Sequence, residues 1–236
     1  MRTALITGGT GGLGMAVTER FLADGWRVTL PYIDDAALED LRGRDFAQSA
    51  RDRLLAIHAD LFDESSVRAC VEAAASSAAE PLTAVVNLVG GFAAGDRVHE
   101  TPIEQFEAQF RANLRPTYLV SAAALPHLLE GGDGAIVCVS TRAALRPFPG
   151  AAGYIASKAA VLALVDALAA EYTADGVRTN AVLPSVIDTP GNRASQPDAG
   201  HSRWVSPQQI ASVIRFLCSQ ASAPVSGAHL PVYGRA

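Results

Sequence analysis

Tyr154 and Lys158 lie four positions apart in the segment GYIASKAA, residues 153–160. The Ala-rich stretch that follows predicts a helix, and residues four apart on a helix share one face. A phenol has an ordinary pKa of about 10, and an ammonium group beside it stabilises the phenolate and lowers that pKa. The pair could therefore transfer a proton near neutral pH. The alternative is a solvated Tyr and Lys pair without a function, which is frequent in helices.

The segment TGGTGGLG, residues 7–14, could bind a phosphate. An apolar run before it predicts a strand, and the residues from Met15 to Ala23 predict a helix that ends at Asp24-Gly25. The first N–H groups of such a helix are unpaired and face an anion, provided that no side chain blocks the approach. Gly9, Gly11 and Gly14 fit the pattern G-x-G-x-x-G of dinucleotide-binding loops. A tight turn without a ligand is the alternative.

The elements that position these residues alternate along the chain. Strand-like apolar runs, separated by segments of helix length, occur at Thr3–Thr7, Arg27–Leu30, Leu54–His58, Ala84–Val89, Gly134–Val139 and Thr179–Leu183. This alternation predicts an α/β fold with a parallel sheet, whose ligands collect beyond the carboxyl ends of the strands. We expect one domain, residues 1–236. The irregular segment Thr189–Ser206 is predicted to be a substrate lid, with an ordinary surface loop as the alternative.

Several motifs together resemble the short-chain dehydrogenases/reductases, in particular enzymes similar to 3-oxoacyl reductases. Thr7-Gly8, three residues, and then Gly12-Leu13-Gly14 are similar to the T-G-x-x-x-G-x-G cofactor loop of that family. The Tyr154 and Lys158 pair matches its YxxxK motif, and the segment Asn180–Thr189 is similar to its N-x-V-x-P-G-x-I-x-T segment. The resemblance covers residues 3 to 234. It implies a single-domain Rossmann-type doubly wound parallel sheet with helices on both faces.

The resemblance also implies an NAD(P)-dependent oxidoreductase that transfers hydride between a nicotinamide cofactor and a small carbonyl or alcohol substrate. Its catalytic residues fall on Asn113, Thr141, Tyr154 and Lys158. Its cofactor contacts fall on Gly8, Thr10, Gly12, Leu13, Gly14, Asp60, Leu61, Asn87, Gly90, Tyr154, Lys158, Ile187 and Thr189. Members of the family are commonly homo-oligomers, so a tetramer or a dimer is expected. The substrate pocket is expected in the lid and around Arg142–Pro149.

Some motifs depart from the family pattern. Leu88 and Val89 replace the second Asn and the Ala of N-N-A-G, and Ser185 replaces a glycine. The usual pair of serines after the fifth strand is Ser140-Thr141 here, which leaves open which hydroxyl acts. These changes favour, as an alternative, a catalytically silent nicotinamide-binding sensor or subunit. The intact Tyr154, Lys158 and Asn113 favour an enzyme.

The choice between NAD and NADP depends on the end of the second predicted strand. A carboxylate there binds the ribose 2′-hydroxyl of NAD, and an arginine accommodates the 2′-phosphate of NADP. Tyr32 stands at the acidic position and Ile33 at the position of the arginine, and Gly11 replaces a basic residue of NADP-type loops. With no evident cation and with Asp34 nearby, the sequence favours NAD.

Composition excludes several other functions. A formal net charge of -5 gives no general attraction to nucleic acid or to anionic membranes. The three cysteines and five histidines lack the spacing of metal ligands, so no metal is predicted. No uncharged apolar run reaches roughly 18 residues, the length that spans a membrane. A soluble, cytoplasmic protein is expected.

Overall fold

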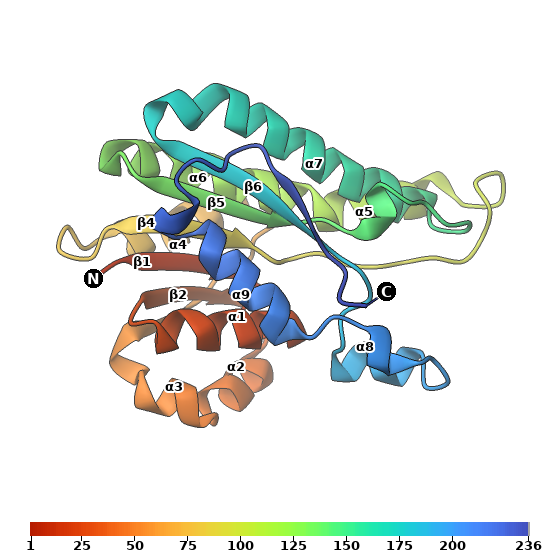
Figure 1. The fold of residues 1–236 in the computed structure, drawn as a ribbon, viewed down its shortest axis with the longest axis horizontal. Helices are drawn as coiled ribbons and strands as arrows, with labels where there is room; N and C mark the ends of the chain where they lie inside the picture. Colours follow the sequence, from red (N-terminus) through yellow and green to blue (C-terminus); the bar gives the residue numbers. More distant parts are fainter. Residues whose placement is uncertain (236) are drawn as a thin grey trace.

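The computed structural model, which describes residues 1–235, is built on one parallel sheet of seven strands (Figure 1). Their order is β3-β2-β1-β4-β5-β6-β7. The bounds are β1 Thr3–Thr7, β2 Arg27–Tyr32, β3 Leu54–His58, β4 Leu82–Asn87, β5 Gly134–Val139, β6 Val177–Pro184 and β7 His229–Val232. The predicted doubly wound sheet is confirmed.

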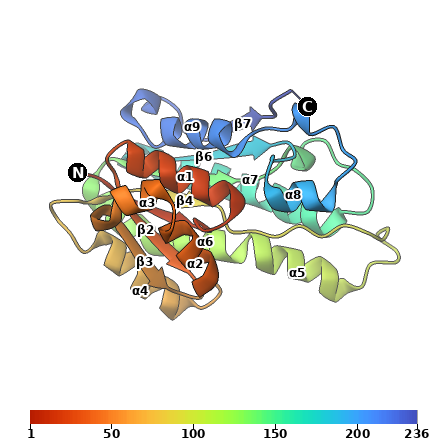
Figure 2. The same cartoon turned by 90° about the horizontal axis from the view of Figure 1, so that it is seen from below.

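Helices cover both faces of the sheet (Figure 2). One face packs against α1 Gly12–Ala23, α2 Asp35–Arg42, α3 Asp45–Ser49 and α9 Pro207–Leu217. The other face packs against α4 Glu64–Ala75, α6 Arg115–Gly131 and α7 Ala152–Tyr172, and α5 Ile103–Asn113 packs against α7. The two faces form separate apolar cores, and each of the strands β1, β4, β5 and β6 contributes residues to both.

The order of the strands places a ligand-binding crevice at the carboxyl ends of β1 and β4. These strands are neighbours, and Thr7 lies in register with Asn87 at their carboxyl ends. The chain leaves β1 for α1 on one face and leaves β4 for α5 on the other. Such a switch point opens a space above the sheet. At the base of this space the Thr7 hydroxyl accepts a hydrogen bond from the Leu88 N–H at 3.0 Å, which joins the end of β1 to the residue after β4.

Several sequence-based boundaries differ from the structure: β2 extends two residues further, to Tyr32, and β6 begins two residues earlier, at Val177. β7 was not predicted, because His229 and Pro231 break the apolar pattern of this short, half-buried edge strand. β4 ends at Asn87, two residues earlier than expected. The segment 189–206 is also more ordered than expected, since it contains α8 Pro190–Ser195 and a short turn, His201–Arg203. A bridge between Ile187 and Val205 joins its two ends.

One stretch, Ala152–Asp175, is long and apolar enough by length and composition to cross a membrane. It consists of α7 and the turn that follows. In the fold α7 packs on β6 and against α5, and Val161, Val165 and Leu168 are buried in the core. These contacts account for its apolar composition.

Candidate active site

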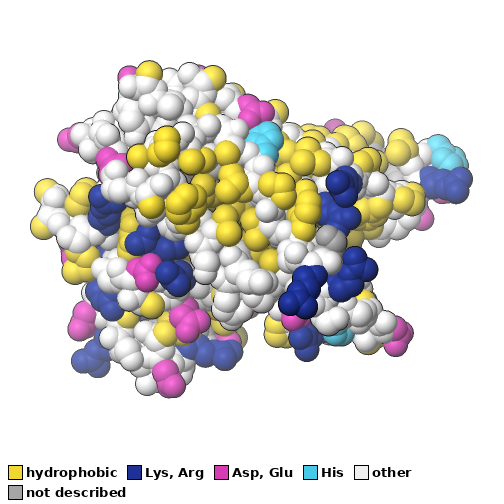
Figure 3. All heavy atoms as spheres, in the orientation of Figure 1, with side chains coloured by type: hydrophobic (Ala, Val, Ile, Leu, Met, Phe, Trp, Pro, Cys, Tyr) yellow, Lys and Arg dark blue, Asp and Glu magenta, His cyan; other side chains and the backbone are white. Residues whose placement is uncertain are grey.

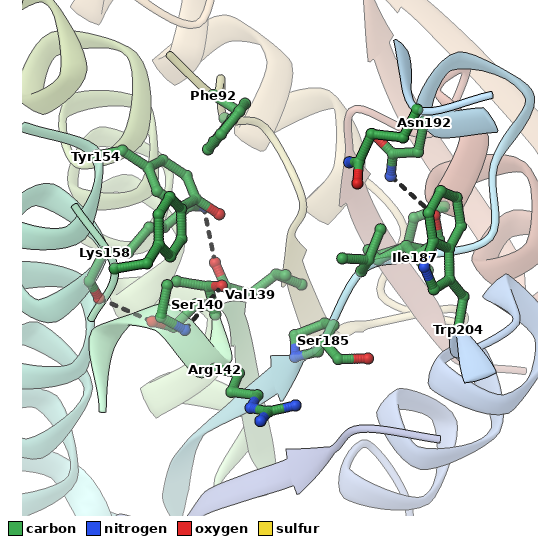
Figure 4. A pocket seen from close by; sticks show the side chains of 18 of the residues that line it. Phe92, Val139, Ser140, Arg142, Tyr154, Lys158, Ser185, Ile187, Asn192 and Trp204 are labelled. Carbon is green, nitrogen blue, oxygen red and sulfur yellow. Dashed lines mark hydrogen bonds between the residues drawn. The ribbon is translucent and has the colours of Figure 1, made fainter. Parts of the chain in front are cut away.

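A cavity of about 1250 Å³ lies beyond the carboxyl ends of β4, β5 and β6. Figure 4 shows Tyr154 and Lys158 on one wall and Ile187, Asn192 and Trp204 on the opposite wall. The first wall comes from α7, and the second from the end of β6 and the segment that contains α8. The predicted lid therefore forms one side of the cavity.

Tyr154 and Lys158 occupy the first two turns of α7, as the sequence predicts. Only 7% of Lys158 is exposed, and its Nζ donates a hydrogen bond to the Val139 carbonyl at 3.0 Å. Burial lowers the pKa of Lys158 to about 8, because removal from water disfavours the ammonium form. This lysine therefore titrates close to neutral pH.

The pKa of Tyr154 differs from the expectation. Burial raises the pKa of this phenol, and a hydrogen bond with the Thr141 side chain lowers it only in part. Lys158 is not among the groups that lower it in this structure, and the Lys158 Nζ is bonded to the backbone of β5 instead. The Tyr154 ring packs nearly perpendicular to the Phe92 ring, with 4.9 Å between the ring centroids.

The two hydroxyls after β5 lie in different surroundings. Ser140 is 3% exposed, and its Oγ donates to the Lys158 carbonyl at 2.8 Å, which fastens α7 to the end of β5. Thr141 is less buried and lines the cavity with its side chain bonded to Tyr154. Its Oγ1 also accepts the Ala143 N–H at 3.2 Å. Thr141 is thus the hydroxyl that adjoins the phenol.

Asn113 is the last residue of α5 and is 1% exposed. Its Oδ1 accepts the Gly91 N–H at 2.9 Å, and its Nδ2 donates to Ser157 Oγ at 3.0 Å. Ser157 in turn donates to the Tyr154 carbonyl at 2.8 Å. The Asn113 side chain does not line the cavity. It connects the loop after β4 to the turn of α7 that carries Tyr154.

The predicted glycines explain the close packing at this point. A Cβ on Gly90 would lie 2.6 Å from Asn113 Oδ1 and 2.9 Å from Lys158 Nζ, so a side chain there would displace these two groups. At the start of α1, a Cβ on Gly14 would lie 2.0 Å from the Gly8 carbonyl, and Gly8 itself has φ of +63°. Gly14 and Gly8 therefore require glycine, the first because of the backbone contact and the second because of its positive φ.

The glycine loop also meets the predicted lid. A Cβ on Gly12 would lie 2.9 Å from the Thr189 methyl carbon, although the two residues are far apart in the sequence. Thr189 caps α8 by accepting the Asn192 N–H at 3.2 Å, and Asn192 Nδ2 donates to the Ile187 carbonyl at 2.8 Å. Leu13 and Ile187 both line the cavity, whereas Thr10 lies in the turn just before α1.

Besides the glycine loop and Thr189, the predicted cofactor contacts Asp60, Leu61 and Asn87 also do not line the cavity. The Asn87 side chain is buried on the α6 side, where its Nδ2 donates to Ser121 Oγ at 3.1 Å, because the last residue of β4 faces that helix. Leu61 is buried in the core under α4 and α6. Asp60 is exposed and accepts the Phe62 N–H at 2.9 Å through Oδ1.

Sequence reasoning missed some lining residues. Leu88, Gly91 and Phe92 line the cavity together with the predicted Gly90. Their position just after β4 was the available signal, since ligands gather at strand ends. Among residues 1–235, no cluster of three or more His, Cys, Asp or Glu side chains could hold a metal ion.

Comparisons with known proteins agree with this architecture. A family model described as enoyl-(acyl carrier protein) reductase matches residues 8–234. The chain is 35% identical to 2-(R)-hydroxypropyl-CoM dehydrogenase of Xanthobacter autotrophicus, over 99% of this chain and 97% of that protein. A solved structure titled short chain dehydrogenase/reductase family protein is 32% identical, with a TM-score of 0.86 and coverage of 99% and 96%. The chain belongs to the short-chain dehydrogenase/reductase family.

Another short-chain dehydrogenase/reductase relative is 4-formylbenzenesulfonate dehydrogenase TsaC1/TsaC2 of Comamonas testosteroni, which is 31% identical over 99% of this chain and 96% of that protein. The chain, like the family, is an oxidoreductase that transfers hydride between a nicotinamide cofactor and a carbonyl or alcohol. The alternative of a catalytically silent sensor or subunit receives no support from these relatives, whose names are those of dehydrogenases.

Proposed function

We propose that Tyr154 is the general acid of carbonyl reduction and that the Thr141 hydroxyl orients the carbonyl oxygen. The observation that supports this is the direct contact between the two side chains on one wall of the cavity. In the reductive direction the phenol gives its proton to the oxygen that becomes the alcohol. In the oxidative direction the phenolate takes that proton back.

The residues fit a nicotinamide dinucleotide. The N-terminus of α1 has no side-chain cap and no acidic residue in its first turn, so its N–H groups remain available to a pyrophosphate. Gly8, Thr10, Gly12, Leu13 and Gly14 surround this point, and Leu13 joins it to the cavity. When bound, the cofactor supplies or receives the hydride. Lys158 would hold the nicotinamide ribose, with Ile187 and Thr189 near the carboxamide.

Asn113 acts as a positioning residue in this proposal. The family resemblance implies that Asn113 positions a water molecule in a proton relay. In this structure both polar atoms of its side chain already have protein partners. Its bonds to Gly91 and Ser157 fix the loop after β4 and the turn that presents Tyr154. Ser140 has a similar supporting role through its bond to the backbone of α7.

NAD remains our proposed cofactor. Tyr32 ends β2 and packs edge-on against His58, with 5.5 Å between the ring centroids, and Ile33 is exposed. Neither offers a cation to a 2′-phosphate. Asp34 caps α2 by accepting the N–H groups of Ala36 and Ala37, so its Oδ1 already has partners before a ribose arrives. The main support for NAD is therefore that Tyr32 and Ile33 are not cationic. Asp34 adds less support, because its carboxylate already caps α2.

We also propose a cytoplasmic homo-oligomer, a tetramer or a dimer. Ile103 on α5 and Tyr118 on α6 are exposed apolar side chains, which an interface through these helices would cover. Light scattering of the purified protein measures the mass of the assembly.

The test of the proposed function is oxidation of NADH and NADPH by the purified protein with a panel of aldehydes and ketones. We expect carbonyl-dependent loss of absorbance at the wavelength of the reduced nicotinamide, with NADH the better donor. Faster turnover and tighter binding with NADPH would contradict the choice of NAD. Tight cofactor binding without turnover of any panel member would instead favour the silent alternative.

A further inference from the structure

We propose that the substrate carries an anionic group, a carboxylate or a sulfonate, and that Arg142, Arg146 and Arg203 bind it. This inference rests on the proposed function, because it assigns the part of the substrate that lies away from the reacting carbonyl. It is argued from the charge of these three arginines and from their position in the cavity that contains Tyr154 and Lys158.

The lining of this cavity is unusual in its charge. Arg142, Arg146, Arg203 and Lys158 line it, and among residues 1–235 no Asp or Glu side chain does. The chain as a whole has more acidic than basic residues, with 24 against 19. An excess of arginine in the lining of this cavity therefore does not follow from composition. Figure 3 shows Lys and Arg side chains gathered beside the C-terminal segment and α8 on this face of the molecule.

The three arginines are free to bind a ligand. Within the described residues 1–235, none of them forms an ion pair, although Arg193 on nearby α8 is paired with Asp188 at 2.5 Å. Arg203 Nε donates to the Arg235 carbonyl at 3.2 Å, and the Arg142 guanidinium lies 5.3 Å from the centroid of the Tyr233 ring. These contacts hold Arg203 and Arg142 in place without neutralising them, and the Arg146 side chain has no partner among residues 1–235.

Their place in the fold points to the substrate and not to the cofactor phosphates. Arg142 follows Thr141 directly, in the short turn Arg142–Ala144, and Figure 4 shows it between the two walls of the cavity, beside Ser185. A 2′-phosphate is read at the end of β2, and Tyr32 and Ile33 do not line this cavity. The pyrophosphate position is the N-terminus of α1, at the glycine loop.

The rest of the cavity fits the apolar part of such a substrate. Phe92 and Phe148 line it with 6.5 Å between their ring centroids, and Phe92 also packs against Tyr154. Phe92 is 63% exposed, so a substrate that covers it removes apolar surface from water. A planar guanidinium binds a carboxylate or sulfonate through two parallel hydrogen bonds. A short apolar carbonyl compound with an anionic end matches both parts.

The test compares acids with neutral partners of the same shape. The pairs are 4-formylbenzoate with methyl 4-formylbenzoate, and 4-oxopentanoate with its methyl ester. We expect kcat/KM of each acid to exceed that of its ester by ~10-fold or more, a factor typical of one charge-assisted contact. In the Arg142→Gln and Arg146→Gln variants this ratio should fall toward one through KM, while the affinity for NADH stays the same. The Arg51→Gln variant removes an equal charge outside the cavity and should keep the ratio.

A binding measurement makes the result independent of turnover. With NAD present, calorimetry should show benzenesulfonate binding at least ~10-fold more tightly than benzenesulfonamide, and Arg142→Gln should abolish that difference. Equal kcat/KM for acids and esters, or equal binding of the two probes, would overturn the inference while the proposed oxidoreductase stands. Failure of the whole carbonyl panel would count against the proposed function, and calorimetry would still decide on the anion.

Discussion

The α7 wall of the cavity and the mouth of the cavity are built in opposite ways. On the wall of α7, Lys158, Ser157 and Ser140 are buried, and each side chain is bonded to a protein partner. At the mouth, Arg146 and Phe148 are exposed, and Arg146 has no side-chain partner among the described residues. A group that transfers a proton needs a fixed position. A group that recognises a substrate needs polar or apolar atoms that are not already bonded to the protein. The buried, bonded side chains therefore suit the reaction, and the exposed side chains at the mouth suit recognition of the substrate.

The largest expected effect comes from the fixed wall. Tyr154→Phe keeps the ring and its contact with Phe92 but removes the proposed proton donor. Turnover should fall by ~10²–10⁴-fold, the usual contribution of a general acid, while the Kd of the cofactor changes little. Steady-state kinetics and a cofactor titration check this. Near-normal turnover would remove Tyr154 from the mechanism.

The next effect is a cost in stability on the same wall. Burial lowers the pKa of Lys158 from 10.5 to about 8, so the folded chain binds this proton less well than the unfolded chain. The cost is complete below pH 8, decreases as the pH rises from 8 to 10.5, and is absent above that range. By linkage it amounts to ~3 kcal/mol.

The measurement for Lys158 is chemical denaturation of the cofactor-free protein between pH 7 and pH 10. The free energy of unfolding of the wild type should increase relative to that of Lys158→Met as the pH rises. Met has a similar length and no charge. Loss of the bond to Val139 shifts the free energy of unfolding by the same amount at every pH, so it does not affect the pH dependence of the difference. A difference that stays the same at every pH would mean that Lys158 has an ordinary pKa.

A further prediction sharpens the distinction between the two hydroxyls after β5. Thr141→Val keeps the shape but removes the hydroxyl beside Tyr154, and kcat should fall by ~10²-fold, as for the loss of one donor to the reacting oxygen. Ser140→Ala removes only a bond to the backbone of α7. It should cost ~1 kcal/mol of stability and little activity. The opposite result in the two variants would assign the catalytic hydroxyl to Ser140.

Much of this protein was determined by local sequence. The alternation of apolar runs with helix-length segments indicates a parallel sheet, because each pattern belongs to one element and repeats along the chain. The spacing of Tyr154 and Lys158 places them on one face of α7, since a helix fixes the relation of residues four apart. The glycine loop likewise forms a strand, a turn and a helix within one short segment.

Only the tertiary structure decided how distant segments meet. Asn113 contacts Gly91 and Ser157, and Gly12 lies beside Thr189, through approaches that no local pattern encodes. The pKa of Lys158 depends on burial by elements far away in the sequence, so spacing alone led to the wrong expectation that it lowers the pKa of Tyr154. Arg142 and Arg203 line one cavity because Arg142 follows β5, Arg203 lies in the segment that follows β6, and these parallel neighbours end at the same edge of the sheet. Their nearness is a property of the fold, since charge and reactivity depend on neighbours in space.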